Sequence, residues 1–358
     1  MSSPQQIKTS VTDLFKISHP IMLAGMGNVS GPKLVAAVTN AGGLGVFGGN
    51  MYTPQMLRDG IAELKSYLVD KDAPFGVDLL LPKIGGTARK TNYDYNKGNL
   101  DELIDIIIES GAKLFVSAIG IAPKAVIDKL HRNGVFYMNM VGHPKHVQKC
   151  LEVGADLICA QGGEGGGHTG DVPLSILIPE VVRLCAKARS PLTGQPVQVV
   201  AAGGISNGET LAASLMMGAA GVWVGTRFVL SEESNASKAH KESVRSAGFD
   251  DTIRTIIFSG RPLRVRNNPY IEDWETNRLP EMKDLTSRGI LPAHHDLDTA
   301  KELTEEMMDH ALHPFLMGKV AATVNELKSA KAIVDEIVDV AAQRLNVGKD
   351  LLLQRSKL

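Results

Sequence analysis

The chain has 358 residues, of which 44% are apolar and 22% are charged, and it contains 36 glycines and 17 prolines. This composition is close to that of an average globular protein, so it excludes collagen-like, intrinsically disordered and coiled-coil classes. The formal net charge of -1 at pH 7 gives no electrostatic footprint for a nucleic acid. The length fits one large domain with an appendage, or two ordinary domains.

The cysteines and the two chain ends bear on the cellular compartment. Cys150, Cys159 and Cys185 form no Cys-x-x-Cys pair, so we expect reduced thiols in a core. No apolar run approaches the roughly 18 residues that span a bilayer, and the first ten residues lack a secretory signal, so we expect no membrane partner. The final Ser356-Lys357-Leu358 matches the peroxisomal address. It predicts a peroxisomal protein bound by the import receptor, with a chance match in a cytoplasmic protein as the alternative.

Short apolar or β-branched runs bounded by turn residues predict eight strands. Segments of helical period lie between these runs, and several of them end in a Gly-Ala pair that is typical of a helix C-cap. Eight strands alternating with helices over about 225 residues predict a (β/α)8 TIM barrel, and a doubly wound open sheet is the alternative. The expected strands are Pro20–Ala24, Leu44–Phe47, Phe75–Leu80, Leu114–Ala118, Val135–Met140, Asp156–Ala160, Val197–Ala202 and Gly221–Val224.

The pattern changes after residue 228, where the barrel of residues 1–228 is expected to end. Residues 229–316 have a charged, helical pattern and predict a helical substrate lobe over the C-terminal face of the barrel. A loop over residues 259–269 carries Arg261, Arg264 and Arg266, which either hold an anionic substrate or lie on the surface. Residues 318–345 predict one long amphipathic helix, so we expect residues 317–358 to pack back on the barrel.

Glycine is concentrated in the first two thirds of the chain, with 31 residues from Gly25 to Gly225 and only five from Gly248 onward. Residues 43–48 match the dinucleotide-binding pattern G-x-G-x-x-G. That pattern requires a strand-to-helix turn, whereas Val46 and Phe47 lie inside an expected strand. The turn over residues 25–31 is better placed, but the next strand ends in Gly48-Gly49-Asn50 without an acidic residue for a ribose. A Rossmann domain is therefore disfavoured.

Two turns after the last two expected strands predict a phosphate site. Gly203, Gly204, Gly225 and Thr226 suit the backbone cradle that barrels commonly build there, because a Cβ atom would block close approach to phosphate oxygens. An alternative uses the G-x-S-x-G match over residues 204–208 as a nucleophile elbow. In that serine hydrolase, Ser206 would be the nucleophile, with partners drawn from the downstream residues His294, Asp296 and His310.

The segment Gln161–Gly170 reads QGGEGGGHTG and follows the sixth expected strand. Its glycines suit a backbone laid against a flat ligand, and His168 at its end is placed as a general base, since the pKa of histidine is near neutrality. The alternative is that His168 caps the following helix. We expect Glu164 to be a structural hydrogen-bonding group. The pairs His294-His295 and His310/His313 lack the Cys or carboxylate spacing of a closed metal site, so no metal is predicted.

Taken together, the motifs PIMLAGM, AGGLGVFGG, AQGGEGGGHTG, VVAAGGI with GVWVGTRF, and SGRP resemble the nitronate monooxygenase (2-nitropropane dioxygenase) family. The resemblance runs from Pro20 to about Leu345. It implies an FMN-dependent barrel that uses O2 to oxidise alkyl nitronates to carbonyl compounds and nitrite. The same superfamily includes NAD(P)H-dependent flavin reductases of enones or acyl thioesters, which remain an alternative.

The resemblance also implies roles for individual residues. His168 aligns with the catalytic base, which would accept the α-proton of neutral nitroalkanes. Many members have Asn where this chain has Asp78, and Ala where it has Gly165. The cofactor contacts implied are Ala24, Gly25 and Met26 beneath the flavin ring, Asp78 and Gln161 on flavin or ribityl groups, Gly166 packed on the cofactor, and Gly203, Gly204, Gly225 and Thr226 around the phosphate.

Overall fold

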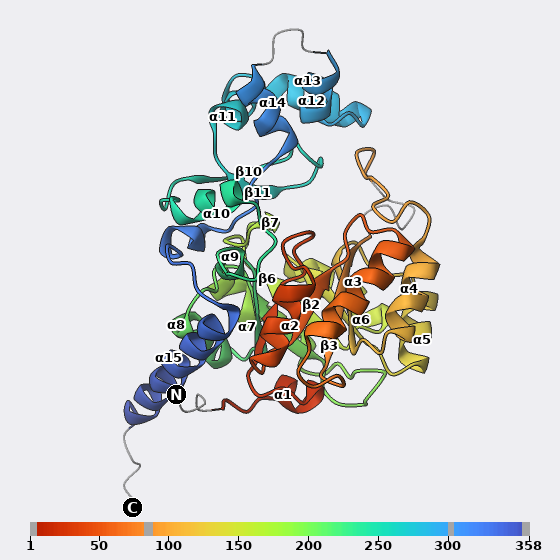
Figure 1. Ribbon diagram of the computed structural model, residues 1–358, viewed down its shortest axis with the longest axis vertical. Helices are drawn as coiled ribbons and strands as arrows, with labels where there is room; N and C mark the ends of the chain where they lie inside the picture. Colours follow the sequence, from red (N-terminus) through yellow and green to blue (C-terminus); the bar gives the residue numbers. More distant parts are fainter. Residues whose placement is uncertain (1–5, 82–88, 300–303, 353–358) are drawn as a thin grey trace, which may run out of the picture.

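The computed structural model describes residues 6–81, 89–299 and 304–352. Eight parallel strands form a nearly closed barrel in the order β1-β9-β8-β6-β5-β4-β3-β2 (Figure 1). The Leu23 N–H of β1 donates to the carbonyl oxygen of Leu44, the residue before β2, at 2.9 Å. This hydrogen bond joins the first and last strands of that order. The TIM-barrel prediction is confirmed, and the open sheet is wrong. The strands are β1 (Ile21–Leu23), β2 (Gly45–Gly48), β3 (Phe75–Leu80), β4 (Leu114–Ile119), β5 (Phe136–Val141), β6 (Leu157–Gln161), β8 (Gln198–Ala202) and β9 (Gly221–Val224).

Helices connect successive strands around the outside of the barrel (Figure 1). Gly111, Gly154 and Gly218, just past the ends of three of these helices, have φ angles of 76°, 100° and 98°. Glycine accepts this left-handed conformation without a Cβ penalty, which explains the Gly-Ala pairs. The helices are α2 (Pro32–Asn40), α3 (Pro54–Tyr67), α4 (Leu100–Glu109), α5 (Lys124–Arg132), α6 (Val147–Val153) after a 3-10 turn (Pro144–His146), α7 (Leu174–Cys185) and α8 (Gly208–Met216).

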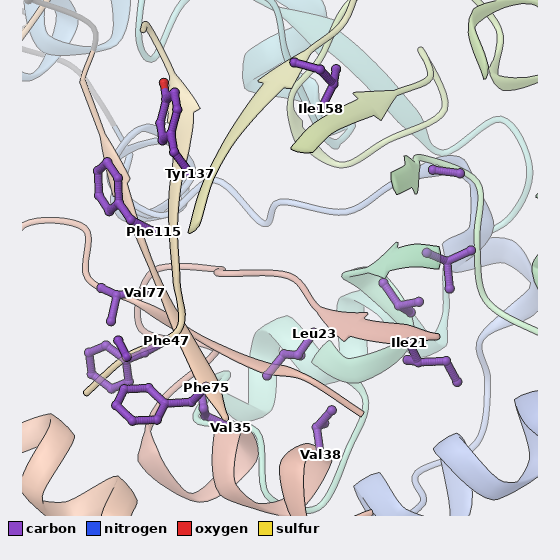
Figure 2. Close-up of a cluster of buried hydrophobic side chains, with 14 of the residues drawn as sticks. Ile21, Leu23, Val35, Val38, Phe47, Phe75, Val77, Phe115, Tyr137 and Ile158 are labelled. Atoms are coloured by element: carbon purple, nitrogen blue, oxygen red, sulfur yellow. The ribbon is translucent and has the colours of Figure 1, made fainter. Parts of the chain in front are cut away.

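Two apolar layers hold the barrel together. The outer layer lies between strands and helices, and Figure 2 shows Phe47 and Phe75 on the side of Val35 of α2 and Phe115 beside Tyr137. The inner layer fills the barrel, and helix α1 (Ser10–Phe15) packs against it through buried side chains. All three cysteines are free and buried, as predicted. The inner layer includes Val11, Phe15, Met22, Val46, Val116, Met138, Cys159, Val200 and Trp223.

The segment after β9 forms a lobe beyond one end of the barrel (Figure 1). It contains helices, as expected, but also a hairpin, of which one strand lies in the predicted loop over residues 259–269 and the other in the segment predicted to be helical. Strand β11 (Leu263–Arg266) pairs with β10 (Thr252–Thr255) and with β7 (Gly167–His168). Apolar residues alternate with arginines in β11, a half-buried strand pattern. The other elements are α9 (Thr226–Val229), α10 (Lys238–Arg245), α11 (Pro269–Thr276), α12 (Leu279–Arg288), α13 (Pro292–Thr299) and α14 (Glu305–Leu312).

The prediction of one helix over residues 318–345 is wrong at its start. Lys319–Thr323 form a 3-10 turn, and α15 (Ala330–Asp350) begins after Ser329, whose side chain accepts a hydrogen bond from the Ala332 N–H. The C-terminal helix α15 packs on α8 and α2. No helix in the described ranges is long and apolar enough to cross a membrane. The C-terminal Ser-Lys-Leu lies outside the described residues, so peroxisomal localisation stays a prediction.

The contact between α8 and α15 depends on one glycine, which gives a first prediction. A Cβ at Gly208 would lie 2.4 Å from the Ala341 nitrogen and 2.6 Å from the Ile337 carbonyl oxygen, both backbone atoms. We expect Gly208→Ala to lower the free energy of unfolding by about 1–3 kcal/mol, as overpacking does. On α15, Gly348 has open space around it, so Gly348→Ala should stabilise by up to about 1 kcal/mol. Urea unfolding measures both, and equal effects would contradict this account.

Candidate active site

A cavity of about 1180 Å³ opens where the barrel strands reach their carboxyl ends. This is the end at which TIM-barrel enzymes build their active sites. The structure brings every residue of the sequence-predicted site to the wall of this one cavity, although their roles stay predictions. These residues are Ala24, Gly25, Met26, Asp78, Gln161, Gly166, His168, Gly203, Gly204, Gly225 and Thr226.

In the glycine loop, residues 162–167, Gly162 and Gly166 are packed against backbone too closely for a side chain. A Cβ at Gly166 would lie 2.6 Å from the Gly318 nitrogen, and one at Gly203 would lie 2.6 Å from the Gly162 carbonyl oxygen. The Gln161 Nε2 donates to the His168 carbonyl oxygen at 2.8 Å, which holds the two ends of the loop together. The Glu164 carboxylate accepts the Leu174 N–H at the start of α7. This contact is the structural role expected for Glu164.

His168 lies where the lobe meets the barrel. Its backbone pairs with Leu263 of β11, and its Nε2 lies 2.8 Å from the Ser259 Oγ. Burial, together with the Arg261 guanidinium, lowers the pKa of His168 to about 4, so the imidazole is neutral at pH 7. The expected alternative, that His168 caps a helix, is wrong because α7 begins at Leu174 and the imidazole bonds to Ser259 instead.

Asp78 forms the floor of the cavity beneath Gly25. Its side chain is 3% exposed, and a Cβ at Gly25 would lie 2.4 Å from the Asp78 Cβ. Burial raises the pKa of Asp78 well above its ordinary value, opposed by a hydrogen bond from the Ala118 backbone. Within the described ranges, Asp78 Oδ1 and Asn50 Oδ1 are buried without a hydrogen-bond partner. Buried polar atoms are normally satisfied, so both invite a ligand.

The loops after β8 and β9 present bare backbone to the same cavity. Gly203 and Gly204 have φ angles of 84° and 74°, a conformation that favours glycine over other residues. The two strands are neighbours in the barrel, which places Gly225 and Thr226 beside this turn. The Thr226 Oγ1 accepts the Gly318 N–H at 2.9 Å. The two loops thus form one concave backbone surface, stabilised by the chain that returns from the lobe.

The structure does not assemble a dinucleotide-binding turn or a serine hydrolase triad from the other sequence motifs. The G-x-G-x-x-G match runs into strand β2, so it makes no strand-to-helix turn. The Ser206 Oγ lies 3.4 Å from the Thr323 Oγ1, and Asp296 accepts hydrogen bonds from Tyr270, Trp274 and Arg278 inside the lobe. The serine hydrolase triad is therefore not assembled. The part of the chain that the structure describes contains no group of three or more His, Cys, Asp or Glu that could hold a metal.

Of the three arginines over residues 259–269, two make structural contacts and one lines the cavity. Arg264 donates to the Gly163 carbonyl oxygen, and Arg266 pairs with Asp251 at 3.0 Å. Only Arg261 of the three lines the cavity. Sequence reasoning missed Ser259, although it lies in the quoted SGRP motif. It also missed a basic segment over residues 143–149, HPKHVQK, which follows β5 and lines the cavity mouth.

Comparisons with known proteins identify the family. The family model described as nitronate monooxygenase matches residues 8–339. A Mycobacterium tuberculosis protein named as a 5-hydroxy-7a-methyl-1-oxo-octahydro-1H-indene-4-carboxyl-CoA dehydrogenase is 31% identical over 97% of this chain and 99% of its own length. The structure of FabK from Thermotoga maritima has a TM-score of 0.76 with 30% identity, covering 97% of this chain and 100% of that one.

A further solved structure agrees with this assignment. Nitroalkane oxidase from Streptomyces ansochromogenes has a TM-score of 0.74 with 25% identity, covering 94% of this chain and 99% of that one. The relatives are oxidoreductases that span nearly the whole chain, and the solved structures share its fold. The chain is therefore an oxidoreductase, and it belongs to the nitronate monooxygenase family.

Proposed function

We propose that the chain binds FMN and uses O2 to oxidise alkyl nitronates, and neutral nitroalkanes, to a carbonyl compound and nitrite. The observation that carries this proposal is the neutral His168 imidazole at the wall of a glycine-lined cavity. Membership of the family supports the reaction. Bound FMN would supply the redox chemistry, while the chain supplies binding, orientation and a base.

The residues present fit a flavin nucleotide. The β8 and β9 loops suit a phosphate, since Gly203, Gly204 and Gly225 line the cavity with backbone that no side chain of their own covers. The unpartnered Asp78 Oδ1 and Asn50 Oδ1 offer polar atoms to a ring lying over the floor. We propose that Ala24, Gly25 and Met26 pass beneath the ring, that Asp78, Gln161 and Gly166 contact it or its ribityl chain, and that Gly203, Gly204, Gly225 and Thr226 hold the phosphate.

His168 would act as the base on a neutral nitroalkane. We propose that the Ser259 hydroxyl donates to the Arg261 carbonyl oxygen, 3.3 Å away, and that its oxygen accepts the proton on His168 Nε2 at 2.8 Å. In this tautomer the lone pair of Nδ1 is free to accept the α-proton. Ser259 is thus a positioning residue that fixes the tautomer. A preformed nitronate has already lost this proton and does not need the base.

A second candidate is NAD(P)H-dependent reduction of an enone or an acyl thioester. The cavity of about 1180 Å³ leaves room for such a substrate beside a flavin, because this volume exceeds the usual 300–1,000 Å³ of ligand sites. The relative named as a CoA dehydrogenase supports it as well. Anaerobic mixing of the yellow protein with NADPH separates the two candidates. Rapid bleaching of the flavin would favour the reductase, and bleaching by a nitronate alone would favour the oxidation.

Replacing the base separates proton removal from oxidation. We expect His168→Asn to lower the rate with a neutral nitroalkane by about 100-fold or more, the usual contribution of a general base, and to leave the rate with a preformed nitronate largely unchanged. Steady-state nitrite release measures both rates, with flavin content checked by absorbance. The exposed His294, which does not line the cavity, provides the control His294→Asn. Equal losses with both substrates would exclude His168 as the base.

The buried Asp78 predicts a pH-dependent stability of the cofactor-free protein. Because the folded state raises the Asp78 pKa above its ordinary value of 3.8, the folded state retains a proton that the unfolded state loses, and stability falls as pH rises above about 4. The uncharged variant Asp78→Asn escapes this loss. Its stability relative to the native chain should therefore increase between pH 4.5 and 7.5, by at most about 1.4 kcal/mol per pH unit.

Urea unfolding at several pH values tests this expectation. The variant Asp298→Asn serves as a matched control, because it makes the same Asp-to-Asn change at an exposed side chain away from the cavity. A constant difference between Asp78→Asn and the native chain would show that Asp78 is ionised in the folded protein.

A further inference from the structure

The mouth of the cavity carries a cluster of basic side chains, which we call the basic rim: Lys124, His143, Lys145, His146 and Lys149. All five line the cavity and are exposed. Lys124 begins α5 after β4, and the other four follow β5. The rim thus belongs to the connections that follow two adjacent strands, including the first residue of α5, a 3-10 turn and the first turn of α6. The proposed nitroalkane chemistry does not use any of these residues.

The positive charge of the rim is only partly balanced. Lys124 pairs with Asp128 on α5. Within the described ranges, no acidic side chain forms an ion pair with Lys145 or Lys149. The nearby acids are committed elsewhere, since Glu152 accepts from Gln148 and Asp171 pairs with Arg254. The pKa of His146 is lowered by burial first, and then by the positive charges of Lys145, His143 and Lys149. The electrostatic part of this shift shows that the local potential is positive.

Below the rim the cavity wall is apolar. Ala122 and Pro123 line one side, and Cys150 and Val153 of α6 line the other. Ala122 and Cys150 are buried, at 1% and 0% exposed, whereas Pro123 and Val153 are half-buried, so the latter two supply the apolar surface that a ligand can reach. A groove with an apolar wall and free ammonium groups at its edge suits a ligand with a flat or aliphatic body and several negative charges.

The rim is separate from the proposed FMN phosphate site, but the segment that carries it packs against the residues that follow the glycine loop. In the barrel, β6 lies between β5 and β8, so the ends of the strands that carry His143 and Gly203 are two strand spacings apart, about 10 Å. Gly142, which lies between β5 and His143 of the rim, is in close contact with Gly170, because a Cβ at Gly142 would lie 2.7 Å from the Gly170 nitrogen. The segment that carries the rim therefore packs directly on the residues that follow His168.

We propose that the basic rim binds the phosphorylated nucleotide tail of a substrate or electron donor whose reactive end reaches His168. The shared chemistry is an adenosine carrying a pyrophosphate and a further ribose phosphate, as in a coenzyme A thioester or in NADPH. Lys145 and Lys149 would contact the phosphates, and the apolar wall would contact the adenine or the pantetheine chain. The inference goes beyond nitronate oxidation and does not depend on it, since it concerns binding.

Equilibrium binding to the full-length protein, as purified with its flavin, tests the inference. Coenzyme A and NADPH are titrated calorimetrically into the native chain and into the double variant Lys145→Gln/Lys149→Gln. At least one of the two should bind the native chain, more weakly as salt rises. The double variant should bind that ligand about tenfold more weakly or worse, because two charge-assisted contacts are lost. Lys187→Gln, at an exposed lysine outside the cavity, should bind like the native chain.

The two sources of the tail are distinguished by the ligand that binds. Binding of coenzyme A alone identifies an acyl thioester, and binding of NADPH alone identifies the reductant; either result supports the rim. A second measurement needs no variant: the bound ligand should protect Lys145 and Lys149, but not Lys187, from acetylation detected by mass spectrometry. The inference is overturned if neither ligand binds at millimolar concentration, or if the double variant and the native chain bind equally well. Failure of nitronate turnover would leave these binding results unaffected.

Discussion

Backbone-to-backbone contact around the glycine loop is the constraint on which the rest of the site depends. The loop touches the β8 turn through Gly162 and Gly203, and the segment returning from the lobe through Gly166 and Gly318. Just beyond it, Gly170 packs against Gly142 at the end of β5. Each contact is closer than a Cβ atom permits, so the glycines are required by packing alone. Together they bring four distant segments of the chain to one end of the barrel.

This packing also explains the environment of His168. The glycine loop ends in β7, and β7 pairs with β11 of the lobe, so the imidazole lies at the seam between barrel and lobe. Arg264 of β11 donates to the Gly163 carbonyl oxygen, which fixes the lobe strand to the loop from the other side. The seam removes water from the imidazole and keeps it neutral. The lobe therefore shapes the chemistry of a residue that the barrel supplies.

Much of the fold and the cavity wall could be predicted because both leave local signals. Buried parallel strands read as short apolar runs, and bare backbone beside a ligand reads as clustered glycine. The prediction of a helix over residues 318–345 was wrong at its start because tertiary contacts determine the backbone there. Residues 318–328 have a helical pattern, yet the Gly318 N–H donates to Thr226 and the Lys319 N–H donates to Glu164. These bonds hold the backbone in another path, and α15 begins only at its Ser329 cap.

The parts of the site that the sequence did not predict also depend on tertiary contacts. β7 has two residues, too few for any periodic signal, and its partner β11 has only four, so its alternation of apolar residues with arginines is short and lies in a segment rich in turn residues. The histidines and lysines over residues 143–149 are visible in the sequence as charged residues of a short helix. Only the barrel topology reveals that they stand at the mouth of the cavity. Ser259 likewise acquires meaning only from its contact with His168.

Comparing FMN with riboflavin tests the central claim, that the glycine-lined cavity is a flavin nucleotide site whose phosphate lies on the β8 and β9 loops. Both compounds are titrated into the cofactor-free protein, and quenching of flavin fluorescence reports binding. The account predicts that FMN binds at least about a hundredfold more tightly, since charge-assisted hydrogen bonds contribute roughly 1.5–3 kcal/mol each. Equal affinities, or no binding of either compound, would contradict it.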